Sequence, residues 1–559
     1  MGLGVLEDKH LTHVPGTSKI EDALTGGIIT TDDIDVADRH RFKRGTGKYS
    51  HIILVPQPSD DPNDPLNWTP LKKHTVFASL MLALGVLCAS SPVLSPGYGT
   101  LMVELDKSLL QIMMTSGASL ITSAAFAPFV TAFALKFGKR PMFLFAVFIA
   151  GMGMVGSALS KNYTSLIATR VIQGIGCAPM EATIFSIVND MYFVHERGVP
   201  SVVIQFVVAF SLDGVGIVSG PCITNLGWQW AFWILSILTL SVVVLGLFTF
   251  HETLFVRDVI SPEFASEDDL KDVSVSDAEK QSQFKPAKGL FCKPWELVDS
   301  GYTSVSKAGF WVTVLRTFPM YMSPMTWFAI LTFGMLQVFI VISSSSIAAV
   351  LMSPPYYFNA TDTGLTSVAS LVGALLALVL FGPILDWCVR FFSARNGGVF
   401  EPEFRLPPMF LATLFVCFGF VGYGYSTNHG IHWMAPTTCL GMLAFGQTIG
   451  CSTTMAYIAD SFCDRSAEAW AAISIVRNII SFSFLWFISD WLAAENNQQV
   501  FGILAGLAVA CTATTIPMYI YGKRVRSWCY RHGFVTFNNQ LVTKTESKTS
   551  ASLDEKASE

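Results

Sequence analysis

One apolar segment, residues 166–188, carries polar and ionisable side chains at a spacing that could serve proton or solute binding. On a helix of 3.6 residues per turn, Arg170, Gln173, Cys177 and Glu181 fall on one face, at offsets of 3, 7 and 11 residues. An ionised side chain in the hydrocarbon of a bilayer costs at least about 2.5–3.5 kcal/mol on insertion scales. We therefore expect this face to border an aqueous cavity with a proton or substrate site. The alternative is a buried pair that locks helices together.

Other polar side chains that interrupt apolar runs are candidates for the same cavity. Arg477 and Asn478 are adjacent in one such run. Arg477 is expected to neutralise an acid across the molecule, such as Glu181 or Asp213, or to bind an anionic group of a solute. The further candidate cavity-lining groups are Gln337, Gln447 and Tyr457. Each of these could equally form an ordinary interhelical hydrogen bond.

The composition indicates a membrane protein. Of its 559 residues, 51% are hydrophobic and 14% are charged, whereas an ordinary soluble domain has about 25% charged residues. Segments long enough to cross a bilayer lie at 74–95, 113–135, 141–160, 165–188, 200–224, 228–250, 325–350, 364–388, 407–426, 432–458, 469–492 and 499–521. We expect an all-α membrane protein with twelve transmembrane helices.

A long polar break after the sixth segment divides the chain into two sets of six. Ile175-Gly176-Cys177 in the fourth segment recurs as Ile449-Gly450-Cys451 in the tenth, which suggests two pseudo-symmetric six-helix halves with a solute site between them. Both ends of the chain are polar, and we expect them to be mostly disordered. The expected organisation is a tail at 1–72, a half at 73–250, a linker with an interfacial segment at 251–324, a half at 325–522 and a tail at 523–559.

Basic residues in the short connections set the orientation. The side with few of them has only Lys107 and Lys161. The other side has Lys72, Lys73, Lys136, Lys139, Arg140, Arg197, Arg390, Arg395, Arg405, Arg465, Lys523, Arg524 and Arg526. The positive-inside rule then predicts a multi-pass protein of the cell membrane with both ends in the cytoplasm. Asn359, in Asn359-Ala360-Thr361, falls outside and could accept a glycan, although its closeness to the membrane argues against it.

Enzyme signatures are missing from the sequence. There is no GxxxxGK[ST] nucleotide loop and no HExxH or GxSxG motif. The eleven cysteines show no CxxC or Cys/His spacing that suggests a metal site. We expect no catalytic residue, no metal, no cofactor and no nucleic-acid partner. The expected partners are a small-molecule substrate, protons and membrane lipid, and the chain is expected to be a monomer.

The chain resembles the major facilitator superfamily, in particular the fungal drug–proton antiporter branch with twelve spans, over roughly residues 58–525. Asp61-Pro62-Asn63-Asp64-Pro65-Leu66-Asn67-Trp68 is similar to a signature that opens many fungal members. From the residues alone, it is a turn with Trp68 as an interfacial anchor. Arg170-Val171-Ile172-Gln173-Gly174 matches the R-x-x-Q-G motif of the fourth helix, which implies that Arg170 helps to couple proton movement to transport.

A second motif lies in the fifth segment. Gly216-x-x-x-Gly220-Pro221 resembles the centre of a motif that the family associates with antiporters, although both ends of the motif differ. Glycines allow close helix approach, and the proline bends the helix, so the alternative is an ordinary kinked and tightly packed helix. Asp213, on the same face, is a second acid candidate for proton coupling.

Two clusters resemble the family's cytoplasmic gating motif. Lys136-Phe137-Gly138-Lys139-Arg140 is similar to its end, but Thr131 and Leu135 replace the usual glycine and aspartate. Asp386 and Arg390 stand at the equivalent place in the second half. Asp386 could pair with a helix N-terminus or a basic residue in one conformation only. The alternative is a cluster that serves topology alone.

The resemblance implies a proton-coupled secondary transporter, most simply an efflux pump that exchanges protons for a toxin, drug or secondary metabolite. One alternative is a proton symporter that imports an organic cation such as a polyamine or an amino-acid derivative. Another is a nutrient receptor that keeps the fold without transport.

Overall fold

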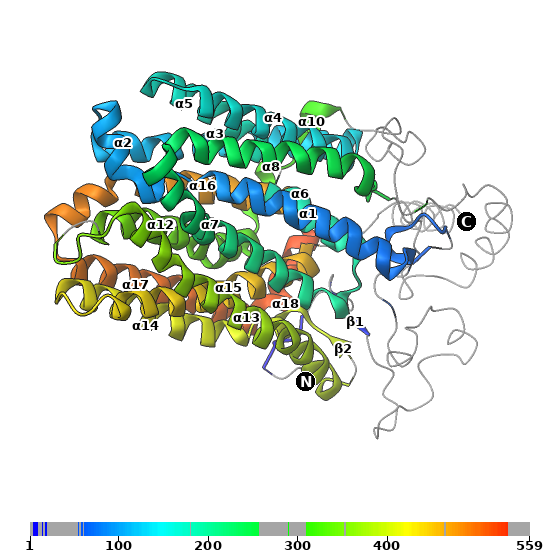
Figure 1. The fold of residues 1–559 in the computed structure, drawn as a ribbon. Coiled ribbons are helices and arrows are strands. Elements are labelled where there is room, and N and C mark those ends of the chain that lie inside the picture. The colour runs from blue at the N-terminus through cyan, green and yellow to red at the C-terminus, as the bar shows by residue number, and fades with distance from the viewer. Residues whose placement is uncertain are drawn as a thin grey trace, which may run out of the picture.

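The helices run side by side in one elongated bundle (Figure 1). The structure is a computed structural model, and it leaves the side chains of residues 18, 19, 180, 181, 195, 348 and 349 undescribed. The residues that it describes are 4–8, 14, 17–19, 54, 58–59, 61–178, 180–255, 289, 309–351, 354–397, 399–462 and 465–534.

One of the six helical paths in the first half is interrupted within the bundle. The first path turns through a 3₁₀ segment at Ser95–Gly97, which contains Pro96. The fourth path comprises a helix that ends at Cys177 and one that begins at Met180. Residue 179 lies outside the described residues, and a continuous stripe from Arg170 to Glu181 stays a prediction. The helices are α1 (Pro70–Ser90), α2 (Tyr98–Leu105), α3 (Leu109–Phe137), α4 (Lys139–Leu159), α5 (Tyr163–Cys177), α6 (Met180–Met191), α7 (Gly198–Leu226) and α8 (Trp228–Thr249).

The second half repeats this arrangement. Its first path also changes pitch, through a π-helical turn at Ile330–Gly334, and a short α10 (Phe310–Leu315) precedes it. The other helices are α11 (Pro324–Ala329), α12 (Met335–Leu351), α13 (Ala360–Arg395), α14 (Pro408–Asn428), α15 (Met434–Phe462), α16 (Ser466–Ala494), α17 (Asn497–Ala513) and α18 (Thr515–Arg531). The last path runs past residue 522, where we expected the tail to begin.

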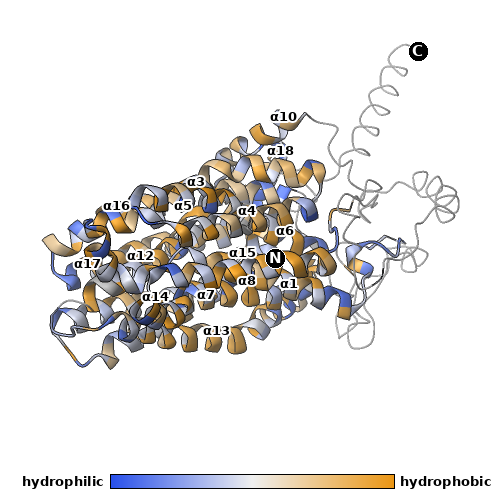
Figure 2. Ribbon diagram, turned by 45° about the horizontal axis from the view of Figure 1, so that its top comes forward, coloured by the Kyte–Doolittle hydropathy of each residue, from blue (hydrophilic) through white to orange (hydrophobic). Residues whose placement is uncertain are grey.

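Eleven stretches of helix in the described chain are long and apolar enough to cross a membrane, and α15 is not among them. It contains five Thr, two Ser and Gln447, and every residue from Thr448 to Phe462 is buried. A helix surrounded by protein needs no apolar surface toward lipid, so its polar composition is compatible with a place inside the bundle. Figure 2 shows apolar residues along the helices and hydrophilic ones gathered at the two ends of the bundle.

The two halves meet chiefly along α7 and α13, which make the most extensive helix–helix contact of the molecule, and along α3 and α16. The α7–α13 contact runs the whole length of α7. Gly198, at its start, meets Asp386, and Gly220, near its end, faces Ala360. In this state, the halves touch at both ends of that pair.

Part of the expected disordered tail is ordered. Residues 4–8 and 17–19 lie against the second half: β1 (Ser18–Lys19) pairs antiparallel with β2 (Val399–Phe400), and Glu7 accepts from Lys523 at 2.6 Å. Burial alone would raise the pKa of Glu401, but Arg526 and Lys523 outweigh it and hold this pKa below its usual range. We call this end of the bundle the terminal face and the opposite end the far face.

The turn before α1 is self-capped. The Asp64 carboxylate accepts from the Leu66 backbone amide at 3.0 Å, and Trp68 Nε1 donates to the Asn63 carbonyl at 3.2 Å. Trp68 is only 7% exposed and packs edge-on against His251, which follows α8. The expectation of an interfacial Trp68 is therefore wrong, because the turn folds back on the protein and buries the ring.

Candidate functional site

Arg170 on α5 is fully buried inside the first half. Its Nη1 donates to the Ser90 carbonyl at 2.6 Å and to Gln173 Oε1 at 3.3 Å, and Gln173 Nε2 donates to Ser90 Oγ at 2.6 Å. The guanidinium carbon lies 4.8 Å from the centre of the Phe232 ring. Its Nε and Nη2 have no hydrogen-bond partner among the described residues, and no described carboxylate pairs with it. A buried charge is costly, so these contacts stabilise Arg170 in this state.

Glu181 lies on α6, and its side chain is outside the described residues. The structure therefore describes only the first part of the expected stripe, in which Arg170 and Gln173 share the end of α1 as a common partner. The role of Glu181 in proton coupling stays a prediction.

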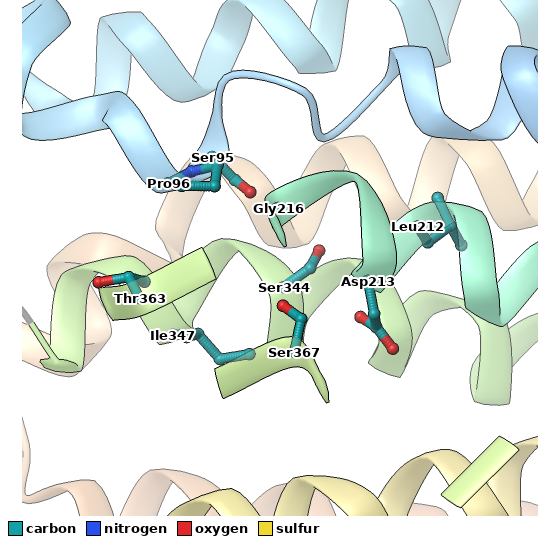
Figure 3. A pocket seen from close by; sticks show the side chains of 9 residues that line it. All are labelled: Ser95, Pro96, Leu212, Asp213, Gly216, Ser344, Ile347, Thr363 and Ser367. Atoms are coloured by element: carbon teal, nitrogen blue, oxygen red, sulfur yellow. The ribbon is translucent and has the colours of Figure 1, made fainter. Parts of the chain in front are cut away.

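A hollow between the two halves is lined by Asp213 (Figure 3). It has a volume of about 300 Å³, open space at its mouth included. The residues that line it come from the turn before α2 and from α7, α12 and α13: Ser95, Pro96, Leu212, Asp213, Gly216, Ser344, Ile347, Thr363 and Ser367. In the view of Figure 3, Ser344 and Ser367 lie between Thr363 and Asp213.

Asp213 is the one ionisable group among these lining residues. It is partly buried and makes no hydrogen bond or ion pair with another described residue. Asp213 lies 15 residues after Gly198, where α7 begins, and 13 residues before Leu226, where α7 ends. At 1.5 Å per residue, it is roughly 20 Å from either end of the helix. An unpaired carboxylate thus lies near the middle of the bundle, at the boundary between the halves.

The other predicted cavity residues do not line this hollow. Gln337 Nε2 donates to Gln205 Oε1 at 2.9 Å, and both side chains are buried, so this pair is an interhelical bond that joins the halves. Gln447 is buried on α15, and its Nε2 makes no hydrogen bond within the described part of the chain. Tyr457 is fully buried, with its ring 5.5 Å from that of Phe328.

Arg477 is turned toward its own neighbour. Its Nε and Nη2 donate to Asn478 Oδ1 at 3.2 and 2.6 Å, and its Cβ packs near Gly334 in the π-helical turn. It makes no ion pair with Asp213 in this state. The structure therefore does not pair Arg477 with Asp213, and its pairing with Glu181, whose side chain is outside the described residues, stays a prediction.

The basic loop between α3 and α4 binds within the first half. Lys139 Nζ contacts Asp190 Oδ2 at 2.5 Å and Ser186 Oγ at 2.7 Å. Glu252 accepts from the backbone amides of Lys139 and Arg140, both at 3.1 Å, and so caps the N-terminus of α4. Lys136 is partly exposed, with its ammonium 5.9 Å from the ring of Phe137.

A polar cluster joins the two halves at the terminal face, and we call it the inter-half latch: Arg197, Asp386, Arg405 and Asp460. Arg197 Nη1 and Arg405 Nε bind the two oxygens of Asp460, at 2.9 and 2.5 Å. Asp386 Oδ1 accepts from the backbone amide of Gly198 at 2.9 Å, at the N-terminus of α7. Arg390 Nε donates to the Asp386 carbonyl at 3.3 Å.

Three latch residues, Arg197, Arg405 and Asp460, were not among the candidates from the sequence. The two arginines were interpreted as topology signals. One feature of the sequence could have predicted the partner of Asp460. Lys139 at the start of α4 pairs with Asp190 near the end of α6. In the second half, Arg405 just before α14 pairs with Asp460 near the end of α15, which is the equivalent place. The internal repeat could thus have predicted a basic partner for Asp460.

Between the hollow and the far face, the glycines of the α7 motif allow backbone contact. A Cβ at Gly220 would lie 2.6 Å from the Ala360 carbonyl, and one at Gly364 would overlap the Gly216 carbonyl. Pro221 follows inside the helix. The motif is therefore a contact between the halves as well as a packing site within the first half.

Known proteins share this architecture. The sequence profile of the Major Facilitator Superfamily matches residues 80–485. An uncharacterized MFS-type transporter of Schizosaccharomyces pombe is 25% identical over 580 residues, covering 96% of this chain and 97% of the relative. The efflux pump radE of Floropilus chiversii is 25% identical over 496 residues, covering 84% of each. The solved proton:xylose symporter XylE of E. coli has a TM-score of 0.55 at 12% identity, covering 81% of this chain and 98% of that one. The chain belongs to the Major Facilitator Superfamily, a family of membrane transporters and not of enzymes.

Proposed function

We propose that this transporter exports a small organic molecule from the cytoplasm in exchange for protons. The observation that carries the proposal is the unpaired Asp213 in a hollow between the halves. A carboxylate that can hold either a proton or a solute gives exchange, since occupancy by one excludes the other. The similarity to an efflux pump supports the outward direction.

The arrangement of contacts supports alternating access around this site. The inter-half latch closes the terminal face, and the contact between α7 and α13 at Gly216 and Gly220 closes the far face. Opening one of the two while the other stays closed would expose Asp213 to one side at a time. A proton supplies about 2.3 kcal/mol per 100 mV of membrane potential and about 1.4 kcal/mol per pH unit.

The same proposal places the protein in the plasma membrane with the terminal face on the cytoplasmic side, because the basic residues of the connections gather at that face. Asn359 then lies outside, exposed just before α13, as a possible glycan acceptor. We further propose the monomer as the working unit, surrounded by lipid, with the domain boundaries given above.

A second candidate is proton-coupled import of an organic cation. It is favoured by the same Asp213, since a carboxylate suits a cationic solute as well as a proton. Import requires proton and solute to be bound together, whereas one unpaired acid in the hollow favours exchange.

The test of export is cellular accumulation. Expression in a host stripped of its own exporters should lower the steady-state content of a panel of fluorescent cationic dyes, and a protonophore should remove the difference. A higher content in the expressing cells would show uptake and contradict the proposal.

Gly220→Val should weaken closure of the far face. The added side chain meets the Ala360 carbonyl, and overpacking costs about 1–3 kcal/mol. We expect slower transport and faster labelling of a cysteine placed at Thr224. Gly502→Val is the matched control, because a Cβ there meets nothing within 4 Å. Equal labelling rates in the two variants would contradict the closing role.

Glu181→Gln should abolish proton-driven transport while the protein still reaches the membrane, because the change removes a titratable group and little volume. Transport measured from pH 5 to 8 checks this. Full activity with an unchanged pH profile would limit proton coupling to Asp213 and Arg170.

A further inference from the structure

We propose that the amino-terminal segment is a removable strap that docks on the second half at the terminal face and, while docked, keeps the inter-half latch closed. We define the strap by its described residues, 4–8, 14 and 17–19. The inference goes beyond the proposed function. It uses the alternate opening of the two faces, and it depends neither on protons nor on the direction of transport.

The strap lies along α18. The Leu6 backbone amide donates to the Ile520 carbonyl at 3.0 Å. Glu7 binds two basic side chains of the same helix. Its carboxylate accepts from Lys523 Nζ at 2.6 Å, and its carbonyl accepts from Arg524 Nε at 3.1 Å. An acidic part of the strap thus meets a basic stretch of helix, and such complementarity favours docking in one register.

Two buried valines anchor the strap. Val5 is 6% exposed and Val14 is 1% exposed, whereas the neighbouring Leu6 is 37% exposed. Asp8 Oδ2 accepts from Ser527 Oγ at 2.7 Å. The ion pair of the strap with α18 has one largely exposed partner, so it adds little to the docking. Segments with few buried apolar contacts open at low free-energy cost, so the strap can detach while the helices stay packed.

The strap braces the chain that leads to the latch. Thr17 Oγ1 donates to Glu401 Oε2 at 2.7 Å, which extends the contact of β1 with β2. Glu401 precedes the 3₁₀ turn η8 (Pro402–Arg405). Arg405, the last residue of η8, binds Asp460 in the latch. Docking therefore holds this turn where it places the arginine in the latch, and a segment that binds the closed state more tightly shifts the population toward that state.

The first test measures docking with a fluorescent peptide of residues 1–19. Because the strap is part of the same chain, its effective concentration at the docking surface exceeds that of a peptide in solution. We expect the peptide to bind a purified chain that lacks residues 2–19, and to bind the full-length chain at least about tenfold more weakly, as measured by fluorescence anisotropy. Equal binding to the two chains, or no binding to the shortened one, would overturn the docking.

Substitutions in the peptide leave the fold of the transporter untouched. Val5→Ser should weaken peptide binding about tenfold, because a buried apolar side chain is lost. Leu6→Ser is the matched control, since the Leu6 side chain is exposed, and it should change the affinity by less than about threefold. Equal losses in the two peptides would show non-specific adhesion and contradict the proposal.

The second test measures the latch itself, with spin labels at Phe137 in the first half and Trp387 in the second, both exposed side chains. Without solute or gradient, the chain that lacks residues 2–19 should populate the longer distance at least about twofold more than the full-length chain. Full-length Val5→Ser should shift the same way, and Leu6→Ser should not. Added peptide should restore the shorter distance in the shortened chain. Identical distributions in the shortened and full-length chains, or a shift to the shorter distance, would overturn the role of the strap.

The strap and the proposed function fail separately, because the distance between the labels is measured without transport. A protein that imports its solute, and whose terminal face opens when the strap is removed, would overturn export and support the strap. An exporter whose distance distribution is the same with and without residues 2–19 would overturn the strap and leave export standing.

Discussion

Arg170→Lys should lower proton-driven transport about ten- to hundredfold while the protein still folds. The guanidinium reaches both the Ser90 carbonyl and Gln173 Oε1 from one planar group. A lysine is a single point charge that can lose its proton when it is buried. Losing one hydrogen bond to a charged group costs about 1.5–3 kcal/mol. If this cost adds to the activation free energy of transport, it gives the expected decrease in rate.

The measurement is the initial transport rate against pH in reconstituted vesicles, with thermal unfolding as the check on folding. Arg395→Lys is the matched control, because Arg395 is exposed at the end of α13 and, in the described part of the chain, stacks on Phe391. A transport rate for Arg170→Lys within twofold of the control would show that Arg170 is a structural charge.

Asp460→Asn should open the terminal face. The change leaves Arg197 and Arg405, which are 7% and 0% exposed, without the carboxylate that binds both. Breaking a buried pair by removing one partner costs about 3–5 kcal/mol. Because Arg197 belongs to the first half and Asp460 to the second, this cost falls on the state in which the terminal face is closed.

Spin labels at Phe137 in the first half and Arg395 in the second would report the opening as a longer distance between the labels. Asp190→Asn is the control, since it breaks the equivalent pair with Lys139 inside the first half alone. The account would be wrong about the latch if both variants gave the distance distribution of the unaltered protein.

The long helices could be predicted from the sequence because a membrane helix needs about 20 apolar residues, and that pattern is local. The turn that interrupts the first path at Ser95–Gly97 could not. Pro92 and Pro96 were visible in the sequence, but a proline can bend a helix without ending it.

Partners across the halves were the least predictable feature. Gln205 and Gln337 are 132 residues apart, and Arg197 and Asp460 are 263 residues apart. Their pairing depends on how the two halves dock, which no local pattern encodes. Asp213 was chosen for its place beside the glycine motif, but its hydroxyl-lined surroundings come from three other segments of the chain.

The most direct test of proton-coupled export uses inside-out membrane vesicles, in which the terminal face points outward, with an acidic lumen. Benzylguanidinium is the probe, because a guanidinium stays charged across this pH range and is not trapped by the gradient alone. The account predicts accumulation in the acidic lumen, lost with a protonophore and in Asp213→Asn vesicles. Accumulation in vesicles with an alkaline lumen, or equal accumulation in wild-type and Asp213→Asn vesicles, would contradict it.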